Sequence, residues 1–207
     1  MLGTARFVAA AAFVFAAGML VGPTVALAQT AKETAKEWNC TGNPDIAWDV
    51  QISGCTAVIQ SGNYSGMNLA WAFNNRGNAY TEKKEYDRAI ADYDQAIRLN
   101  PKYALGFDGR GINYRNKGQL DRAIADFDQA ILLNPNLWQA FQNRGNSYAD
   151  KDQQDRAIAD YDQAIRLDPK NAKAYYNRGL AKQKNGDTSG GDTDIARARQ
   201  LQPGIGQ

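Results

Sequence analysis

Histidine is absent from this 207-residue chain, and cysteine occurs only twice. Without histidine there can be no Ser-His-Asp or Cys-His catalytic arrangement, and no zinc site with an imidazole ligand. General acid–base chemistry near neutral pH would need carboxylates, lysines or tyrosines with displaced pKa values. We therefore expect no catalytic residue, no cofactor and no metal site, and an enzyme is the least favoured functional class.

An excess of positive charge is also missing. The chain has 24 Lys and Arg against 22 Asp and Glu, and the two signs are interspersed. A nucleic-acid-binding protein needs a basic stripe that neutralises phosphates, so we expect no nucleic-acid partner. Apolar residues make up 43% of the chain, which is enough for a hydrophobic core.

Long apolar runs are confined to the N-terminus. Residues 1–6 carry one positive side chain, residues 7–21 are uncharged and apolar, and a Gly-Pro pair then precedes Ala-Leu-Ala at 26–28. This order is typical of a secretory signal peptide, so we predict cleavage after residue 28, export across the inner membrane and a periplasmic location. The alternative is an uncleaved anchor, since the uncharged segment is long enough to span a bilayer. Residues 29–43 form a polar lead-in.

Export affects the interpretation of the two cysteines. In an oxidising compartment a small, even number of cysteines favours a disulfide, here Cys40–Cys55, and two free buried thiols are the alternative. A loop of this length would stabilise the fold by about 3 kcal/mol on the chain-entropy model. The sequence Ile-Ser-Gly-Cys that ends at Cys55 is similar to a lipoprotein box, but it lies too far from the apolar run.

A sequence repeat dominates the rest of the chain. The segment Asp-Arg-Ala-Ile-Ala-Asp-(Tyr/Phe)-Asp-Gln-Ala-Ile begins at Asp87, Asp121 and Asp155, so the interval between copies is constant. A constant period of this length is typical of proteins built from stacked structural units. An Arg-Gly pair precedes each copy, and its arginines, with a fourth that continues the period, are Arg76, Arg110, Arg144 and Arg178. A proline ends each unit: Pro101, Pro135, Pro169 and Pro203.

The repeat resembles the tetratricopeptide-repeat (TPR) family, whose pattern is an aromatic, Leu-Gly, Tyr, Ala, a second aromatic and Pro. The resemblance implies an all-α solenoid of four helix-turn-helix repeats within residues 70–203, of the type found in exported bacterial TPR proteins. The first repeat shows the pattern as Phe73, Arg76-Gly77, Tyr80, Ala89, Tyr93 and Pro101. The repeat boundaries are 70–103, 104–137, 138–171 and 172–203, and a tail follows at 204–207.

The spacing of residues also predicts helices without the family name. Ala70, Phe73, Gly77 and Tyr80 recur on one face of a helix, with small residues where two helices would approach closely. In the fourth repeat Lys182, Gly191 and Ile195 replace the tyrosine, the alanine and the second aromatic. A weaker terminal repeat suits a cap with one face in water, and we expect its last helix to start late, at about residue 192.

An N-terminal cap is predicted as well. Residues 44–61 align without gaps with the second helix of the first repeat, and in this alignment Asp49 takes the place of Asp87. We therefore expect a lone capping helix there, within a capping and linker segment at 44–69, held by the disulfide.

The four repeated arginines occupy a position where the family usually has leucine. A buried arginine needs a carboxylate partner, and either the set Asp92, Asp126, Asp160 or the set Asp94, Asp128, Asp162 has the right period. The fourth repeat keeps only the first position. We therefore predict a pair inside each hairpin, with ligand binding by the arginines as the alternative. The pairs are Arg76–Asp92, Arg110–Asp126, Arg144–Asp160 and Arg178–Asp194.

The resemblance also implies a concave groove, lined by the first helix of each repeat, that binds a peptide or a helix. Asn75, Asn143 and Asn177 would hold the ligand backbone, or else they are family consensus residues that bind nothing. The break in this series at Gly109 suggests an apolar spot for a ligand side chain. The residues expected to line the groove, apolar in the second repeat and basic at the C-terminal end, are Trp71, Asn75, Asn78, Leu105, Asp108, Ile112, Gln139, Asn143, Asn146, Lys173, Asn177 and Lys184.

The functional expectation is a protein–protein interaction module in the cell envelope, an adaptor that holds a protein or peptide segment. The alternative is a structural component that associates with itself and has no peptide ligand. After signal cleavage we expect no contact with a membrane.

Overall fold

The computed structural model describes residues 39–41 and 45–207. The predicted signal peptide at 1–28 and most of the polar lead-in lie outside these residues. The described part contains a lone helix, α2 (Trp48–Gln60), and then four antiparallel hairpins, with no strand. The hairpins are α3 (Met67–Glu82) with α4 (Tyr86–Leu99), α5 (Ala104–Asn116) with α6 (Leu120–Leu133), α7 (Trp138–Asp150) with α8 (Gln154–Leu167), and α9 (Ala172–Lys184) with α10 (Thr188–Leu201).

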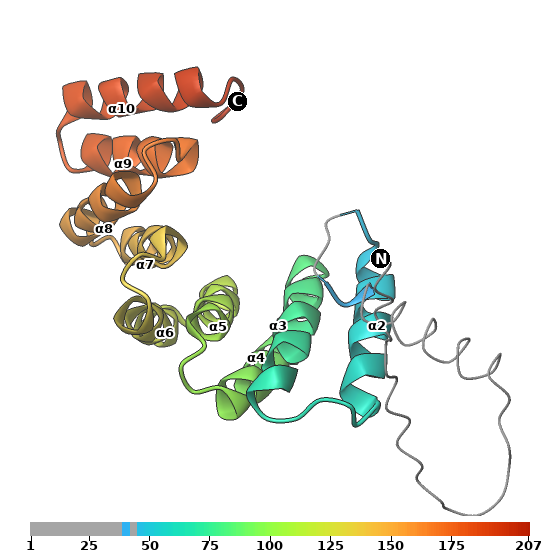
Figure 1. Ribbon diagram of the computed structural model, residues 1–207. Helices are drawn as coiled ribbons and strands as arrows, with labels where there is room; N and C mark the ends of the chain where they lie inside the picture. The colour runs from blue at the N-terminus through green and yellow to red at the C-terminus, as the bar shows by residue number, and fades with distance from the viewer. Residues whose placement is uncertain (1–38, 42–44) are drawn as a thin grey trace, which may run out of the picture.

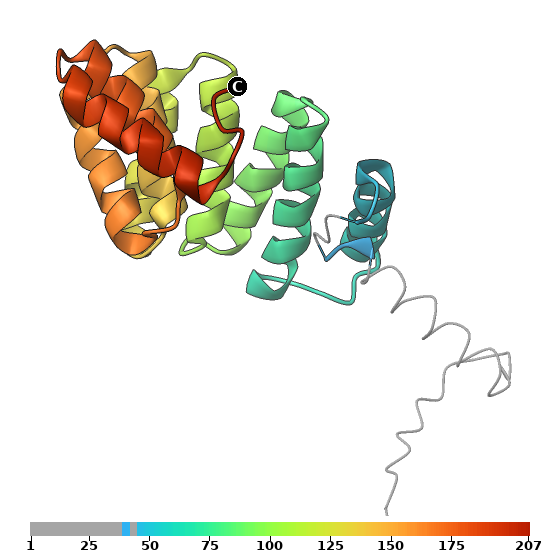
Figure 2. The same ribbon diagram turned by 90° about the horizontal axis from the view of Figure 1, so that it is seen from above.

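The hairpins stack in chain order into an arc that runs from α2 to α10 (Figure 1). Each first helix packs against its own partner and against the helix before it, and successive first helices also contact one another. The second helices α4, α6, α8 and α10 do not contact one another. The array therefore curves with α3, α5, α7 and α9 on its inner face, and Figure 2 shows the successive pairs from above. Within the described residues no helix is long and apolar enough to cross a bilayer.

Small and aromatic residues meet where the two helices of a hairpin pack. The ring of Phe127 is fully buried and lies against Gly111, where an added Cβ would come within 2.7 Å of the ring. Only glycine leaves room for so close an approach. In the last hairpin the aromatic is replaced by Ile195, and an added Cβ at Gly179 would lie 2.7 Å from the carbonyl oxygen of Gly191. Two facing glycines there let the helix backbones approach directly.

The last helix starts earlier than the sequence suggested. We expected it to begin at about residue 192, but α10 begins at Thr188 because Asp187 caps it, its Oδ1 accepting a hydrogen bond from the Gly190 amide at 2.9 Å. The helix-breaking tendency of the Gly-Gly pair is overcome by this cap and by the close packing of Gly191.

The N-terminal helix α2, Trp48–Gln60, lies within the segment 44–61 in which a capping helix was expected. Helix α2 packs on α3, as the second helix of each hairpin packs on the next first helix. The Cys40–Cys55 disulfide is present, with the two Cα atoms 4.6 Å apart. It holds residues 39–41 on α2, and the two cysteines form a buried cluster with Val58 and Ala72.

Each repeated arginine after the first binds two aspartates, one in its own hairpin and one in the hairpin before. Arg110 donates from Nε and Nη2 to Asp126 at 2.8 and 2.7 Å, and from Nη1 to Asp94 at 2.6 Å. The hydrogen bonds to Asp126 raise the pKa of Arg110 above its ordinary value despite its burial. Arg144 and Arg178 repeat this geometry. The two aspartate sets that the sequence offered as alternatives are thus used together.

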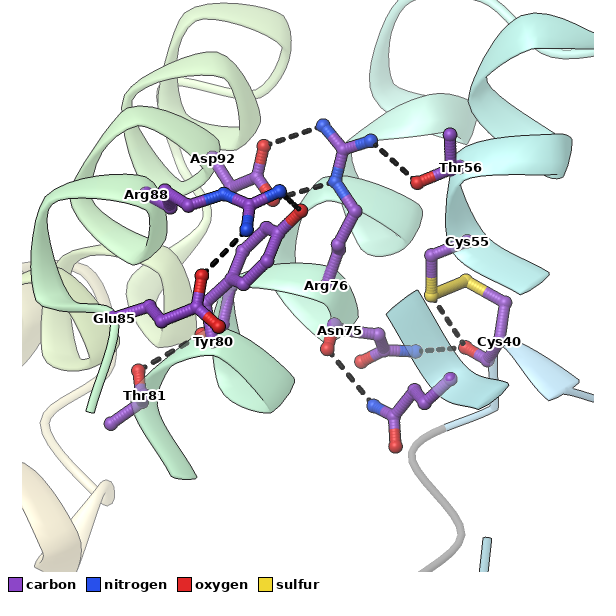
Figure 3. A network of polar contacts seen from close by, with 12 residues as sticks. Cys40, Cys55, Thr56, Asn75, Arg76, Tyr80, Thr81, Glu85, Arg88 and Asp92 are labelled. Atoms are coloured by element: carbon purple, nitrogen blue, oxygen red, sulfur yellow. Dashed lines mark hydrogen bonds and ion pairs between the residues drawn. A yellow bond between two sulfur atoms is a disulfide. The ribbon is translucent and has the colours of Figure 1, made fainter. Parts of the chain in front are cut away.

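The first arginine, Arg76, shows how the contacts change at the N-terminal end of the array. Arg76 has its bidentate partner in Asp92, at 2.7 Å from both Nε and Nη2, but within residues 39–41 and 45–207 no hairpin precedes it. Its Nη1 donates instead to Thr56 of α2 at 3.0 Å (Figure 3). In the alignment of α2 with α4, Thr56 is the equivalent of Asp94, so the capping helix reproduces the contact with a neutral acceptor. At the other end, Lys182 replaces the repeat tyrosine and pairs with Asp194 at 2.9 Å.

The two partners of Arg110 should contribute unequally to stability. Asp126→Asn leaves a partly buried guanidinium with one carboxylate, and we expect the free energy of unfolding to fall by about 2 to 3 kcal/mol. Asp94→Asn removes the partner whose side chain is 42% exposed, and we expect a loss of at most about 1 kcal/mol. Urea unfolding of both variants measures the difference. Equal losses would contradict the assignment of the buried pair as the main contact.

Removal of the disulfide should destabilise one end of the array. Cys40→Ala/Cys55→Ala should reduce the free energy of unfolding by about 3 kcal/mol and loosen α2 and α3 before the distant hairpins, because each hairpin contacts only its neighbours. Amide hydrogen exchange, read helix by helix, checks this. Equal deprotection of α2 and α9 would show that the cap acts on the whole array.

Candidate functional site: the inner face of the array

Two cavities lie on the inner face. The N-terminal cavity, of about 250 Å³, lies among α3, α4 and α5, and the C-terminal cavity, of about 450 Å³, lies among α5, α7, α8 and α9. The N-terminal cavity is lined by Asn74, Asn78, Thr81, Glu82, Tyr93, Leu105, Asp108, Gly109 and Ile112. The C-terminal cavity is lined by Arg115, Asn146, Ala149, Asp150, Gln154, Tyr161, Asn177, Leu180, Ala181 and Lys184.

The structure distributes the predicted groove residues unevenly. The N-terminal cavity contains Asn78, Leu105, Asp108 and Ile112, and the C-terminal cavity contains Asn146, Asn177 and Lys184. The other five line neither cavity: Trp71, Asn75, Gln139, Asn143 and Lys173.

Two of these five belong to the N-terminal cap. The Asn75 side chain donates to the Cys40 carbonyl oxygen at 2.6 Å, and the Gln51 side chain donates to the Asn75 carbonyl oxygen at 2.9 Å (Figure 3). Trp71 packs edge-on against Tyr64, with ring centroids 6.0 Å apart. The expectation that Asn75 offers its amide to a ligand is therefore corrected: its donor holds the disulfide-linked segment.

The other predicted asparagines link successive hairpins. Asn143 donates to Asp108 Oδ1 at 3.0 Å, and Asn177 donates to Asn146 Oδ1 at 2.8 Å. The interruption of the series at Gly109 has a packing cause, because a Cβ there would lie 2.4 Å from the Tyr93 ring. The apolar spot expected at Gly109 is thus filled by Tyr93, while Leu105 and Ile112 still line the cavity beside it.

A correlated pair of positions sets the polarity of the inner face. The hydroxyls of Tyr93 and Tyr161 donate to Asn78 and Asn146 at 2.7 and 2.9 Å. A buried hydroxyl needs a polar partner, and a phenyl or alkyl group does not. The second and fourth hairpins have no tyrosine at the position of Tyr93 and Tyr161, and they carry apolar residues at both positions of the pair. The four pairs in chain order are Asn78–Tyr93, Ile112–Phe127, Asn146–Tyr161 and Leu180–Ile195. The repeat alignment contains this signal, and sequence reasoning missed it.

The cationic groups of the C-terminal cavity have carboxylate partners. Arg115, which sequence reasoning also missed, pairs with Asp150 at 2.7 Å. Lys184 pairs with Asp152 at 2.7 Å. Lys173 is exposed and lies outside both cavities. Of the two lysines expected to make this end of the groove basic, one is thus paired with a carboxylate and the other lies outside the cavity.

Asp108 is the exceptional residue of the inner face. Its side chain lines the N-terminal cavity, yet the residue is only 8% exposed. Burial raises its pKa to about 6, although the hydrogen bond from Asn143 acts in the opposite direction. The equivalent residues of the other hairpins are uncharged: Asn74, Gln142 and Tyr176.

Sequence models of a known family match most of the array. Models described as tetratricopeptide repeat match residues 70–103 and 104–137, and a model described as TPR repeat matches residues 145–186. Together they cover more than half of the chain, and the first two matches each span one repeat. The chain belongs to the tetratricopeptide-repeat family. No curated protein matches it in sequence.

Solved TPR structures have the same fold. MamA (residue 41 to the end) from Desulfovibrio magneticus RS-1 is 15% identical, with a TM-score of 0.66 over 91% of this chain and 100% of that one. YrrB, described as a TPR protein with an unusual peptide-binding site, is 19% identical, with a TM-score of 0.62 over 89% and 94%. The first TPR of Spaghetti (RPAP3), bound to the HSP90 peptide SRMEEVD, is 23% identical, with a TM-score of 0.57 over 60% and 99%.

Asp108 should destabilise this TPR array at neutral pH. Its folded pKa of about 6 exceeds the ordinary 3.8, so the folded state binds a proton more tightly than the unfolded state does. The destabilisation is absent below pH 4, develops as the pH rises from 4 to 6, and is complete above that range. Asp108→Asn should therefore raise the free energy of unfolding at pH 7, by on the order of 2 kcal/mol, and by nearly nothing at pH 4.

Urea unfolding at the two pH values tests this expectation. The facing titratable groups are Glu82, which is exposed, and Tyr93, whose pKa burial raises far above this range. Asp150→Asn is the control, because Asp150 is exposed and already paired with Arg115. A variant at position 108 that is less stable than the wild type at pH 7 would contradict the prediction.

Proposed function

We propose that this protein is an adaptor that binds a peptide or protein segment along the inner face of its TPR array. The observation that carries the proposal is the pair of cavities on α3, α5, α7 and α9, in which amide and charged side chains stand beside exposed leucines. Leu105 is 48% exposed at the N-terminal cavity, and Leu180 is 43% exposed at the C-terminal cavity. An apolar contact flanked by polar groups of fixed orientation is suited to a peptide side chain and its backbone.

Preorganisation supports the same function. The polar side chains of the inner face are held by hydrogen bonds between hairpins, such as that from Asn177 to Asn146, so that binding requires little ordering of the site. Two similar folds are described with peptide ligands or peptide-binding sites, those of RPAP3 and YrrB.

The proposed location is the periplasm. It rests on the signal-like sequence at 1–28 and on the disulfide, which persists in an oxidising compartment. We propose no catalytic role, because the repeated buried aspartates are engaged by arginines.

Self-association is the second candidate, and one observation favours it. No hairpin of the described residues covers the outer face of α2, which has a shallow hollow of about 370 Å³ beside Val50, a residue that is 44% exposed. Light scattering at several concentrations tests this candidate, since a second copy on α2 would raise the mean mass with concentration.

A matched pair of double variants tests the groove. In the groove variant, Leu105→Arg/Leu180→Arg, a long charged side chain enters each cavity and should prevent binding. The control variant, Met67→Arg/Leu132→Arg, adds the same charge at two exposed residues that line neither cavity. Envelope extract is passed over each immobilised protein, and the retained proteins are identified by mass spectrometry.

We expect a partner that the wild type and the control variant retain and the groove variant loses. Retention of the same partner by all three proteins would place binding on another face. If none of them retains a partner and the mean mass rises with concentration, the self-association candidate replaces the adaptor. Circular dichroism confirms that each variant keeps its helices.

A further inference from the structure

The N-terminal cavity contains a buried carboxylate that the protein does not neutralise. Five aspartates are buried in the described residues, and four of them receive two hydrogen bonds each from an arginine of their own hairpin. The fifth is Asp108, whose hydrogen bond comes from the neutral amide of Asn143. No lysine or arginine of the described residues forms an ion pair with it. A buried charge without a counter-charge is unfavourable, so a cation from outside would be attracted to this position.

The surroundings of Asp108 select the shape of that cation. Leu105 and Ile112, one helical turn to either side on α5, give the cavity apolar walls. The ring of Tyr93 closes it at Gly109. Glu82, exposed at the end of α3, adds a second negative charge at the same cavity. An aliphatic stem with a cationic head matches apolar walls that lead to a carboxylate, because such side chains bury the stem and keep the charge paired or solvated.

The rest of the inner face lacks this combination. In the C-terminal cavity Asp150 is neutralised by Arg115, and the nearby Lys184 by Asp152. The positions equivalent to Asp108 in the other hairpins are uncharged. The inner face therefore has one unneutralised buried charge among its described residues, near its N-terminal end.

We propose that the N-terminal cavity is a recognition site for one lysine or arginine side chain of the bound segment, with Asp108 as its counter-ion. The proposal rests on the proposed function of the inner face and names the chemistry that it recognises. A single basic side chain seated at Asp108 sets the register of the segment along the array, and Leu180 and the amides of the C-terminal cavity contact residues further along it.

Selected peptides provide the test. Random twelve-residue peptides displayed on phage are selected on the purified wild-type protein, and the enriched sequences are synthesised with a fluorescent label. Dissociation constants are measured by fluorescence anisotropy for the wild type, Asp108→Asn, Asp121→Asn and the groove variant. Each peptide is also made with its basic residue replaced by glutamine.

We expect the enriched peptides to share one lysine or arginine. Asp108→Asn should weaken their binding by roughly tenfold to a hundredfold, because the ligand's charge then loses its buried partner. Asp121→Asn, at an exposed aspartate of α6 that lines neither cavity, should leave the affinity unchanged. Replacement of the basic residue by glutamine should weaken binding to the wild type but not to Asp108→Asn, since the two changes remove the same interaction. Asp108→Asn is expected to be the more stable protein, so unfolding does not explain its loss of affinity.

Different results would overturn the cation site at Asp108 and the proposed binding on the inner face. Peptides without a common basic residue, or peptides that bind Asp108→Asn as tightly as the wild type, would overturn the cation site. If such peptides still fail to bind the groove variant, binding on the inner face stands. Peptides that bind the groove variant as well as the wild type would overturn both proposals.

Discussion

The fork of hydrogen bonds from each repeated arginine is the interaction on which the array depends. One edge of the Arg110 guanidinium binds Asp126 in its own hairpin, and the remaining nitrogen binds Asp94 in the hairpin before. Each hairpin of a linear array contacts only its neighbours, so the stability of the whole rests on such interfaces. An arginine is suited to this role because its planar fork holds two carboxylates in fixed directions. Leucine, the usual residue here, could only fill space.

The ends of the array follow from the same geometry. In the part of the chain that the structure describes, only α2 precedes the first arginine, and Thr56 of α2 supplies the neutral acceptor that completes its contacts. The disulfide and the Asn75 side chain then hold the segment at Cys40 against this cap. In the last hairpin Ala196 stands at the position whose aspartate binds the arginine of a following hairpin elsewhere in the array, and Lys182 adds a second cation to Asp194. At both ends the repeat thus differs where the described residues contain no neighbouring hairpin: Thr56 takes the place of a carboxylate acceptor, and Ala196 removes a carboxylate that would lack its arginine.

Because these contacts hold the hairpins in place, the inner face is presented as a fixed surface. Tyr93 and Tyr161 are each hydrogen-bonded to an asparagine of their own hairpin. The two hairpins that lack such a tyrosine have apolar residues at both positions. Beside these hydrogen-bonded pairs Asp108 differs, since its charge is buried and has only an amide donor. The contrast with the four arginine-bound aspartates connects the stability of the array with its proposed selectivity.

The sequence by itself determined the helical repeat, its period and the family, because the small, aromatic and proline positions recur at a constant interval. It also indicated which aspartate pairs with the repeated arginine inside each hairpin, because the fourth repeat retains only that aspartate position. It misplaced the start of α10, since the propensity of glycine was weighed without the Asp187 cap. Only the tertiary structure decided that each internal arginine uses both aspartates, that Asn75 serves the cap, that Tyr93 fills the place at Gly109 and that Asp108 is buried. The physical reason is that these contacts join residues of adjacent hairpins, or of the cap and its neighbour, and burial and neutralisation there depend on how the hairpins stack.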